Sequence, residues 1–209
     1  STPNTRAKNR SQNVLPHEKT RVRLQVPDGS ASSDYINASF ILDESGKPAY
    51  IACQGPLEET TCDFWRMIWQ ENASVIVMLT RVFEIDRPKC WVYWPKRVDP
   101  VLQVGSEFCL RLVSSTAFQH YIVRKIVLER VGTSGCPLAA SDFDVHAKPQ
   151  LIKVERRTLL HIQYIAWPDY GAPPSSESFH EIRRLASHYN SPGAPIVVHC
   201  SAGLGRTGT

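Results

Sequence analysis

The last dozen residues, Val198 to Thr209, constrain this chain more than any other stretch. An apolar, β-branched run over 195–198 predicts a buried strand, and it leads into His199, Cys200 and a glycine-containing turn that ends at Arg206. Successive backbone N–H groups in such a turn can bind an anion, and a helix beginning near Arg206 would add its positive end. The same field favours a thiolate at Cys200, and a guanidinium can bind two phosphoryl oxygens at once.

An isolated cysteine beside a glycine turn would be interpreted as a buried structural residue. Here the spacing Cys-x5-Arg, with Gly203 and Gly205 inside it, follows directly on a strand. This combination favours a phosphate-transfer site that needs neither a metal nor a cofactor.

The residues from His199 to Gly208 resemble the signature loop of the protein tyrosine phosphatases. Other landmarks of that family occur in the family's order, namely Lys8-Asn9-Arg10, Asp34 to Ser39, Gln54-Gly55-Pro56, Asp63-Phe64-Trp65 and Trp167-Pro168-Asp169. The resemblance covers nearly the whole chain. It implies an α/β fold with a highly twisted mixed β-sheet flanked by helices, and a tyrosine-specific phosphatase of the non-receptor type.

The resemblance also implies a two-step mechanism. Cys200 would attack the phosphate of phosphotyrosine to form a cysteinyl-phosphate, while Asp169 protonates the leaving oxygen. In the second step Asp169 would accept a proton from the attacking water. The loop between Cys200 and Arg206 would bind the phosphoryl oxygens together with the guanidinium of Arg206. The residues of this loop are Ser201, Ala202, Gly203, Leu204 and Gly205.

Four further residues receive supporting roles from the resemblance. The hydroxyl of Thr207 would bond the sulfur of Cys200 and ease its departure in the second step. His199 would hydrogen-bond to backbone behind the loop and support the thiolate. Glu84 and Lys89 match a loop that braces Arg206 and the loop of the acid, although without the family they would be interpreted as a surface ion pair.

The segment after Lys8-Asn9-Arg10 departs from the family pattern. Asn13 matches the position that binds the backbone of the substrate peptide, where many members have aspartate. Ser11 stands where the family usually has a tyrosine that stacks on the phosphotyrosine ring. Loss of that stacking costs on the order of 0.5–1.5 kcal/mol, so we expect weaker binding of phosphotyrosine and less secure discrimination against phosphoserine.

Hydrophobic patterns predict the other elements of a single domain over residues 1–209. Seven further segments have the composition of strands, and they are 35–41, 49–53, 74–80, 91–94, 108–113, 120–128 and 154–164. Two helices are predicted at 58–72 and 176–188, and a surface insertion at 132–149. Phosphatases of this family continue past the signature loop into further helices, so we expect the chain to be a C-terminally truncated catalytic domain that is inactive in isolation.

Composition limits the partners. No apolar run approaches the ~18 residues of a transmembrane segment, and a basic N-terminal region without regular aromatic residues argues against nucleic acid. The six scattered cysteines suggest neither a zinc site nor a disulfide framework, which indicates a reducing, cytoplasmic location. The expected partners are phosphotyrosine-containing proteins or peptides, with phosphate or vanadate-like anions in the active site.

Two alternatives remain open on the sequence. A broader cysteine phosphatase acting on phosphoserine, phosphothreonine or phosphoinositides is favoured by Ser11 and the basic N-terminus, but the Lys8-Asn9-Arg10 loop argues against it. A pseudophosphatase that binds phosphotyrosine without turnover would usually lack the cysteine, the arginine or the acid. Cys200, Arg206 and Asp169 are all present.

Overall fold

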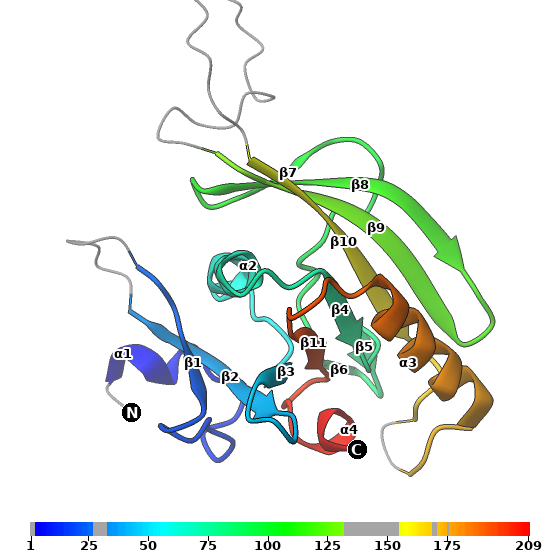
Figure 1. Cartoon of the computed structure of the whole chain (residues 1–209), viewed down its shortest axis with the longest axis horizontal. Coiled ribbons are helices and arrows are strands. Elements are labelled where there is room, and N and C mark those ends of the chain that lie inside the picture. The colour runs from blue at the N-terminus through cyan, green and yellow to red at the C-terminus, as the bar shows by residue number, and fades with distance from the viewer. Residues whose placement is uncertain (1–2, 27–32, 132–154, 169–170, 175) are drawn as a thin grey trace, which may run out of the picture.

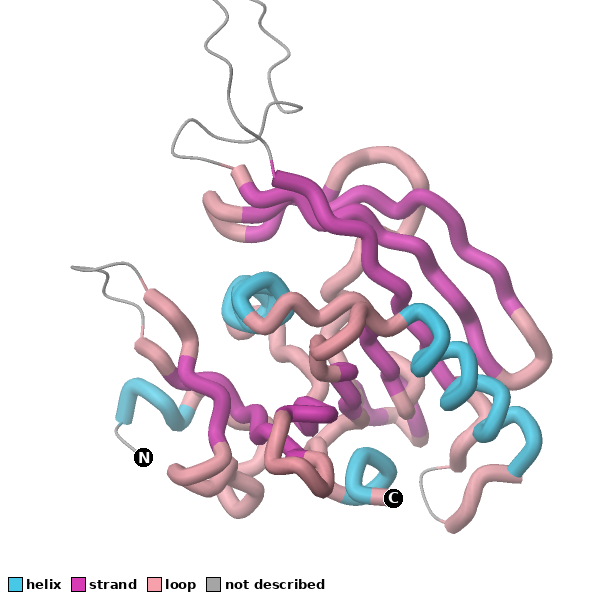
Figure 2. The backbone as a smooth tube through the Cα atoms, viewed as in Figure 1, coloured by secondary structure: helices cyan, strands magenta, loops and turns pink. Residues whose placement is uncertain are grey.

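The computed structural model describes residues 3–26, 33–131, 155–168, 171–174 and 176–209. Strands dominate this part of the chain, and the helices are few (Figure 2). In chain order the elements are α1 (Pro3–Arg6), β1 (Arg21–Arg23), β2 (Tyr35–Leu42), β3 (Pro48–Cys53), α2 (Thr61–Gln70), β4 (Val75–Met78), β5 (Phe83–Glu84), β6 (Arg87–Pro88), β7 (Leu102–Val104), β8 (Phe108–Ala117), β9 (Tyr121–Arg130), β10 (Glu155–Tyr164), α3 (Ser176–Tyr189), β11 (Ile196–His199) and α4 (Gly205–Gly208).

The main sheet is mixed, as the sequence predicts. Its nine strands lie in the order β1-β2-β3-β11-β4-β10-β9-β8-β7. The four central strands β3, β11, β4 and β10 run parallel, and the outer strands pair antiparallel. Because the carboxyl ends of parallel strands meet at one edge, the loops after β3, β4, β10 and β11 come together there, and this edge is where open α/β sheets bind ligands.

The two longer helices cover opposite faces of the sheet (Figure 1). α2 buries Phe64, Trp65 and Ile68 in the larger core, each at most 1% exposed. α3 packs Ile182 and Ala186 against β4 and β10 in a second core on the other face. Both apolar stripes follow the helical spacing of the sequence, which is why the two helices could be predicted.

Two predicted features differ in the structure. Residues 91–94 belong to no strand, although Tyr93 and Trp94 are buried. Ring contacts with neighbouring aromatic side chains hold Tyr93 in place instead of a strand ladder, and a short apolar run cannot distinguish these cases. Cys109 is disulfide-bonded, which the cysteine spacing did not predict. The predicted insertion at 132–149 lies outside the described residues.

Candidate active site

Cys200 directly follows β11 and is 6% exposed. The backbone around it is packed so closely that two positions must be glycine. A Cβ atom on Gly203, which has a φ of +76°, would lie 2.5 Å from the carbonyl carbon and oxygen of Cys53. A Cβ atom on Gly55 would lie 2.6 Å from the carbonyl oxygen of Cys200. The end of β3 and the loop after Cys200 are therefore in backbone contact, and Gly55 N–H donates to the Ser201 carbonyl at 2.8 Å.

The loop after Cys200 presents donors without acceptors. Within the described part of the chain, the backbone N–H groups of Ser201, Ala202, Gly203 and Leu204 donate to no carbonyl and no side chain. The loop ends in the single turn of α4, in which Gly208 N–H donates to the Leu204 carbonyl at 3.0 Å. Unpaired N–H groups on consecutive residues form an anion-binding concavity.

Arg206 lies in α4 and is held by Glu84 of β5. Both terminal nitrogens of the guanidinium lie 2.8 Å from the two carboxylate oxygens of Glu84, and Nη1 also donates to the Leu79 carbonyl at 3.1 Å. Burial works against the charged form of Glu84. Hydrogen bonds from Arg206, from the Arg81 backbone and from Thr80 outweigh it and lower the pKa of Glu84 to about 2. The structure thus brings together Arg206 and Glu84, as the resemblance implied.

Two other predicted residues lie nearby. The hydroxyl of Thr207 is buried and has no hydrogen-bond partner among the described residues, so it does not make the bond to the Cys200 sulfur that the resemblance implies. Lys89 follows β6, and its backbone N–H donates to the Val82 carbonyl at 2.8 Å. This bond ties the end of the β5–β6 hairpin back to its beginning.

His199 is fully buried behind the loop. Its Nδ1 lies 3.0 Å from the carbonyl oxygen of Cys200, and its Nε2 lies 2.7 Å from the hydroxyl of Tyr93. Burial lowers the pKa of His199 to about 4. The same Tyr93 hydroxyl lies 2.9 Å from Nε2 of His161 on β10. The hydrogen bond from His199 to the backbone was expected, but no sequence pattern distinguishes Tyr93 or His161 from other buried residues.

The Lys8-Asn9-Arg10 segment is tied to the loop after β3. The guanidinium of Arg10 donates to the carbonyls of Gly55 and Pro56 at 2.5 and 2.6 Å, and Arg10 N–H donates to the side chain of Gln54 at 3.0 Å. The side chain of Asn9 is buried among polar partners and accepts from Tyr35 and Asn37. These bonds fix the start of the chain beside the loop that contacts Cys200.

Ser11 and Asn13 follow this anchored segment. Ser11 is half-buried and Asn13 is exposed. The backbone N–H of Asn13 donates to the hydroxyl of Ser11 at 3.3 Å. The serine therefore shapes a local turn, and it presents no ring at the position where the family usually places one.

Asp169 lies outside the described residues, but both sides of its loop are anchored. Trp167 is 6% exposed, and its indole N–H donates to the Gly171 carbonyl at 3.0 Å. Gly171 has a φ of +99°, a conformation that favours glycine. The ring of Trp167 also meets Phe179 of α3 edge to face, and Arg81 donates to the Ile165 carbonyl at 2.8 Å.

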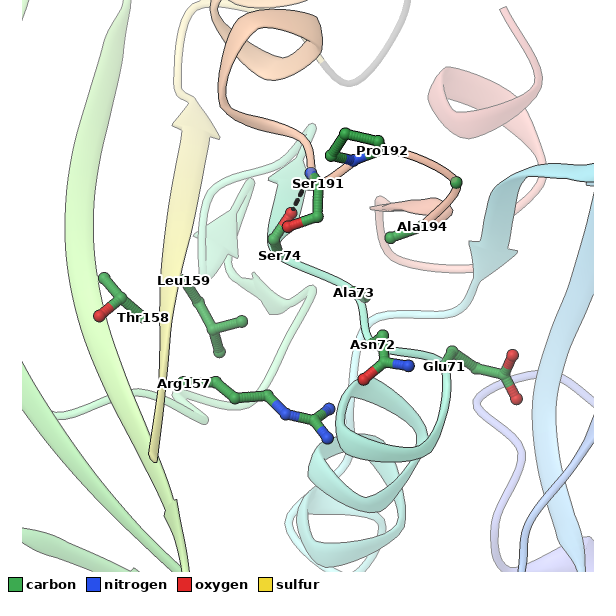
Figure 3. A pocket seen from close by; sticks show the side chains of 11 residues that line it. Glu71, Asn72, Ala73, Ser74, Arg157, Thr158, Leu159, Ser191, Pro192 and Ala194 are labelled. Carbon is green, nitrogen blue, oxygen red and sulfur yellow. Dashed lines mark hydrogen bonds between the residues drawn. The ribbon is translucent and has the colours of Figure 1, made fainter. Parts of the chain in front are cut away.

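Two cavities lie along the central strands, one beside this arrangement and one far from it. One of about 410 Å³ lies between α3 and α4, and Arg206 and Thr207 contribute to its wall. Another of about 550 Å³ lies at the amino ends of β4 and β11, at the far end of the strands from Cys200 (Figure 3). Its wall includes Ser74, whose hydroxyl accepts from the Ser191 N–H at 2.8 Å. Its lining holds none of the residues predicted for catalysis.

The described residues contain neither a metal-binding cluster nor a membrane-spanning helix. No group of three or more His, Cys, Asp or Glu side chains there could hold a metal ion. No helix in this part of the chain has the length and hydropathy needed to cross a membrane.

Comparison with known sequences places this site in a family. The family model described as protein-tyrosine phosphatase matches residues 5–209. The human tyrosine-protein phosphatase non-receptor type 2 is 36% identical over 211 residues, which cover 99% of this chain and 45% of the relative. The human receptor-type tyrosine-protein phosphatase C is 38% identical over 208 residues, which cover 99% of this chain and 14% of the relative. The chain thus spans less than half the length of either relative.

Comparison with solved structures gives the same result. PTPN18 in complex with HER2 phosphopeptides matches with a TM-score of 0.83 and 34% identity, covering 100% of this chain and 69% of that one. The catalytic domain of human protein tyrosine phosphatase non-receptor type 18 matches with a TM-score of 0.83 and 35% identity, covering 100% and 67%. Together with the signature loop, the fold and the family match, these likenesses show that the chain belongs to the protein-tyrosine phosphatase family.

Proposed function

We propose that the protein hydrolyses phosphotyrosine in proteins or peptides through a cysteinyl-phosphate on Cys200. The observation that carries the proposal is the set of unpaired N–H groups on residues 201–204, which follow Cys200 and precede an arginine fixed by Glu84. The loop offers donors where the equatorial oxygens of a transferred phosphoryl group gather charge. Arg206 adds a fixed positive charge at its end.

The chemistry divides into two steps. The thiolate of Cys200 attacks phosphorus and the bond to the tyrosine oxygen breaks, while Asp169 gives that oxygen a proton. Water then attacks the cysteinyl-phosphate, Asp169 takes up its proton, and the sulfur leaves as a thiolate. The buried, unpaired hydroxyl of Thr207 is available to donate to the departing sulfur. Such general acid catalysis typically contributes about 10²–10⁴-fold.

The proposed substrate rests on a similar structure, and the proposed location rests on the chemistry of Cys200. PTPN18, a similar structure, was solved with HER2 phosphopeptides bound, and we assign phosphotyrosine peptides to this chain by analogy. Residues 1–209 form part of one catalytic domain, since a single sheet runs from β1 near the N-terminus to β11 before Cys200. The cytoplasm is the proposed location, because the reaction needs a reduced Cys200, and the disulfide at Cys109 is the observation that argues against it.

The test is vanadate-sensitive hydrolysis of a phosphotyrosine peptide and a sequence-matched phosphoserine peptide by the intact protein. We expect turnover of the phosphotyrosine peptide only, and no turnover by the Cys200→Ser variant. Comparable rates on both peptides would favour the broader phosphatase that Ser11 suggests. Binding of the phosphotyrosine peptide without turnover would show a pseudophosphatase instead.

A further inference from the structure

A chain of buried hydrogen bonds leads from Arg124 on β9 to the carbonyl of Cys200. Nη1 of Arg124 lies 3.3 Å from Nδ1 of His161. Nε2 of His161 lies 2.9 Å from the hydroxyl of Tyr93, which lies 2.7 Å from Nε2 of His199. Nδ1 of His199 completes the chain at 3.0 Å from the Cys200 carbonyl oxygen. Tyr93, His161 and His199 are each 0% exposed.

The direction of every bond in this chain is fixed by its two ends. A carbonyl oxygen can only accept, so Nδ1 of His199 carries the proton and Nε2 accepts from the Tyr93 hydroxyl. A guanidinium can only donate, so Nδ1 of His161 accepts and its Nε2–H donates to the Tyr93 oxygen. Both rings must be neutral for this pattern. Burial lowers the pKa of His199 to about 4 and that of His161 well below its usual range.

A second chain of contacts leads from the same nitrogen of Arg124 toward Arg206. Nη1 carries two hydrogens, and through the second it donates to Oε1 of Gln163, with 3.0 Å between the nitrogen and the oxygen. The amide nitrogen of Gln163 donates to the Thr80 carbonyl at 3.2 Å. The hydroxyl of Thr80 donates at 2.9 Å to the Glu84 oxygen that also accepts from Arg206. Gln163 and Thr80 are buried as well.

We propose that Arg124 is a positioning residue for both ends of the phosphate site, acting on Cys200 through His161 and on Arg206 through Gln163. Through the first branch the cation polarises a directional series of hydrogen bonds that ends at the backbone of Cys200, where a stronger donor favours the thiolate. Through the second branch it fixes Gln163 and Thr80, and thereby the carboxylate that orients Arg206. This inference rests on the proposed function, because it assigns Arg124 to the same reaction.

Alkylation of Cys200 by iodoacetamide reports on the first branch without requiring turnover. The pKa values of the other titratable rings on the first branch, those of Tyr93, His161 and His199, are shifted away from neutral pH. Burial raises the pKa values of Cys53 and Cys90, that of Cys90 to about 12, and it lowers the pKa of His199 to about 4 and that of His161 well below its usual range. The charged side chains that face the route are Arg10, Arg124, Arg206 and Glu84, and the pKa of Glu84, about 2, lies well below neutral pH. The pH profile of alkylation, corrected with the Cys200→Ser variant, therefore reports on Cys200.

Protection of Cys200 by inorganic phosphate reports on the second branch, since phosphate binding depends on the orientation of Arg206. The single-branch variants are His161→Phe and Gln163→Met, and Arg124→Met removes both branches. Arg157 of β10 supplies a matched control. The guanidinium of Arg124 lies over the ring of Trp94. The guanidinium of Arg157 likewise lies over a tryptophan ring, 3.9 Å from the centroid of Trp69. Its side chain extends toward the end of α2, at the far cavity (Figure 3).

We expect Arg124→Met to slow alkylation at neutral pH by about twofold to tenfold, the range for one lost hydrogen bond. The pH profile of alkylation should shift to higher pH, and the protection of Cys200 by phosphate should weaken by a similar factor. His161→Phe should change only the profile, Gln163→Met only the protection, and Arg157→Met neither. Arg124→Lys, which keeps the charge and donors, should recover part of both effects and serves as the test variant if Arg124→Met fails to fold.

Two results would overturn the proposal. In one, the Arg124 variants match Arg157→Met in both measurements. In the other, His161→Phe and Gln163→Met each change both the pH profile of alkylation and the protection by phosphate. Such a result would indicate that the substitutions loosen the core in general. Failure of the proposed function looks different, because it shows in the unaltered protein. Either phosphate then fails to protect Cys200 even there, or phosphate protects Cys200 but the phosphotyrosine peptide is not hydrolysed.

Discussion

Glu84 binds Arg206 through two parallel hydrogen bonds of 2.8 Å, and the two side chains are only 8% and 10% exposed. The fork geometry fixes the plane of the guanidinium and leaves Arg206 no freedom to follow a substrate. The β5–β6 hairpin is thus a brace for the phosphate site. The pair is buried, so removal of either partner leaves an uncompensated charge.

Glu84→Gln should lower kcat/KM for a phosphotyrosine peptide and destabilise the fold. The pKa of Glu84 is about 2 in the folded protein, below the ordinary value of 4.5. Because the folded pKa is the lower one, the charged pair stabilises the protein fully above about pH 4.5, by at most about 3 kcal/mol. That contribution disappears as the pH falls toward 2. Urea unfolding at several pH values should show a gap between the two proteins that narrows below about pH 4.5, and a constant gap would contradict the assignment.

Gly203 and Gly205 provide a pair of variants that tests the geometry of the loop. Gly203→Ala would place a methyl group 2.5 Å from the Cys53 backbone at a φ of +76°, and we expect at least ~100-fold loss of activity from such a displaced loop. A Cβ atom on Gly205 would have no atom within 4 Å apart from its chain neighbours and the backbone of its own helix. Gly205→Ala should keep activity within a few-fold and strengthen the start of α4. Similar losses of activity in both variants would contradict this explanation, because only Gly203→Ala places a methyl group against the Cys53 backbone.

Local patterns carried the prediction of most elements and of the position of Cys200. Helices α2 and α3 follow apolar stripes of helical period, and β11 is a short β-branched run that leads directly into His199 and Cys200. Such signals depend on neighbours in the sequence. The pairing of Glu84 with Arg206 spans 122 positions, so only the resemblance to a family could predict it.

The buried network of Tyr93, His161 and His199 could be predicted neither from local sequence patterns nor from the resemblance to a family. The bonds from Tyr93 to His161 and His199 span 68 and 106 positions. A single histidine in an apolar strand gives no sign of its partner, and Tyr93 occurs where the sequence predicts a strand that the structure lacks. Such contacts depend on the register of β9, β10 and β11, which side-chain periodicity does not fix between distant strands.

Ser11→Tyr tests whether the substrate pocket lacks an aromatic wall. If it does, the added ring should tighten binding of a phosphotyrosine peptide by about threefold to tenfold, as expected for one aromatic stack. Ser11→Ala is the control, because it removes the hydroxyl that accepts from Asn13 without adding a ring. Isothermal titration in a Cys200→Ser background gives the affinities. Unchanged affinity of the tyrosine variant would indicate that another group already fills this position.

Asp169→Ala tests the assignment of Asp169 as the general acid. Its effect should depend on the leaving group, because a basic aryl oxide needs a proton in the first step whereas an acidic one departs without it. For an aryl phosphate with a basic leaving group we expect kcat to fall by about 10²–10⁴-fold, and for one with an acidic leaving group the loss should be far smaller. The variant should still bind a phosphotyrosine peptide, since Cys200, Arg206 and the loop between them are unchanged. Steady-state kinetics across a series of aryl phosphates measures the difference, and equal losses throughout would assign the proton transfer to another residue.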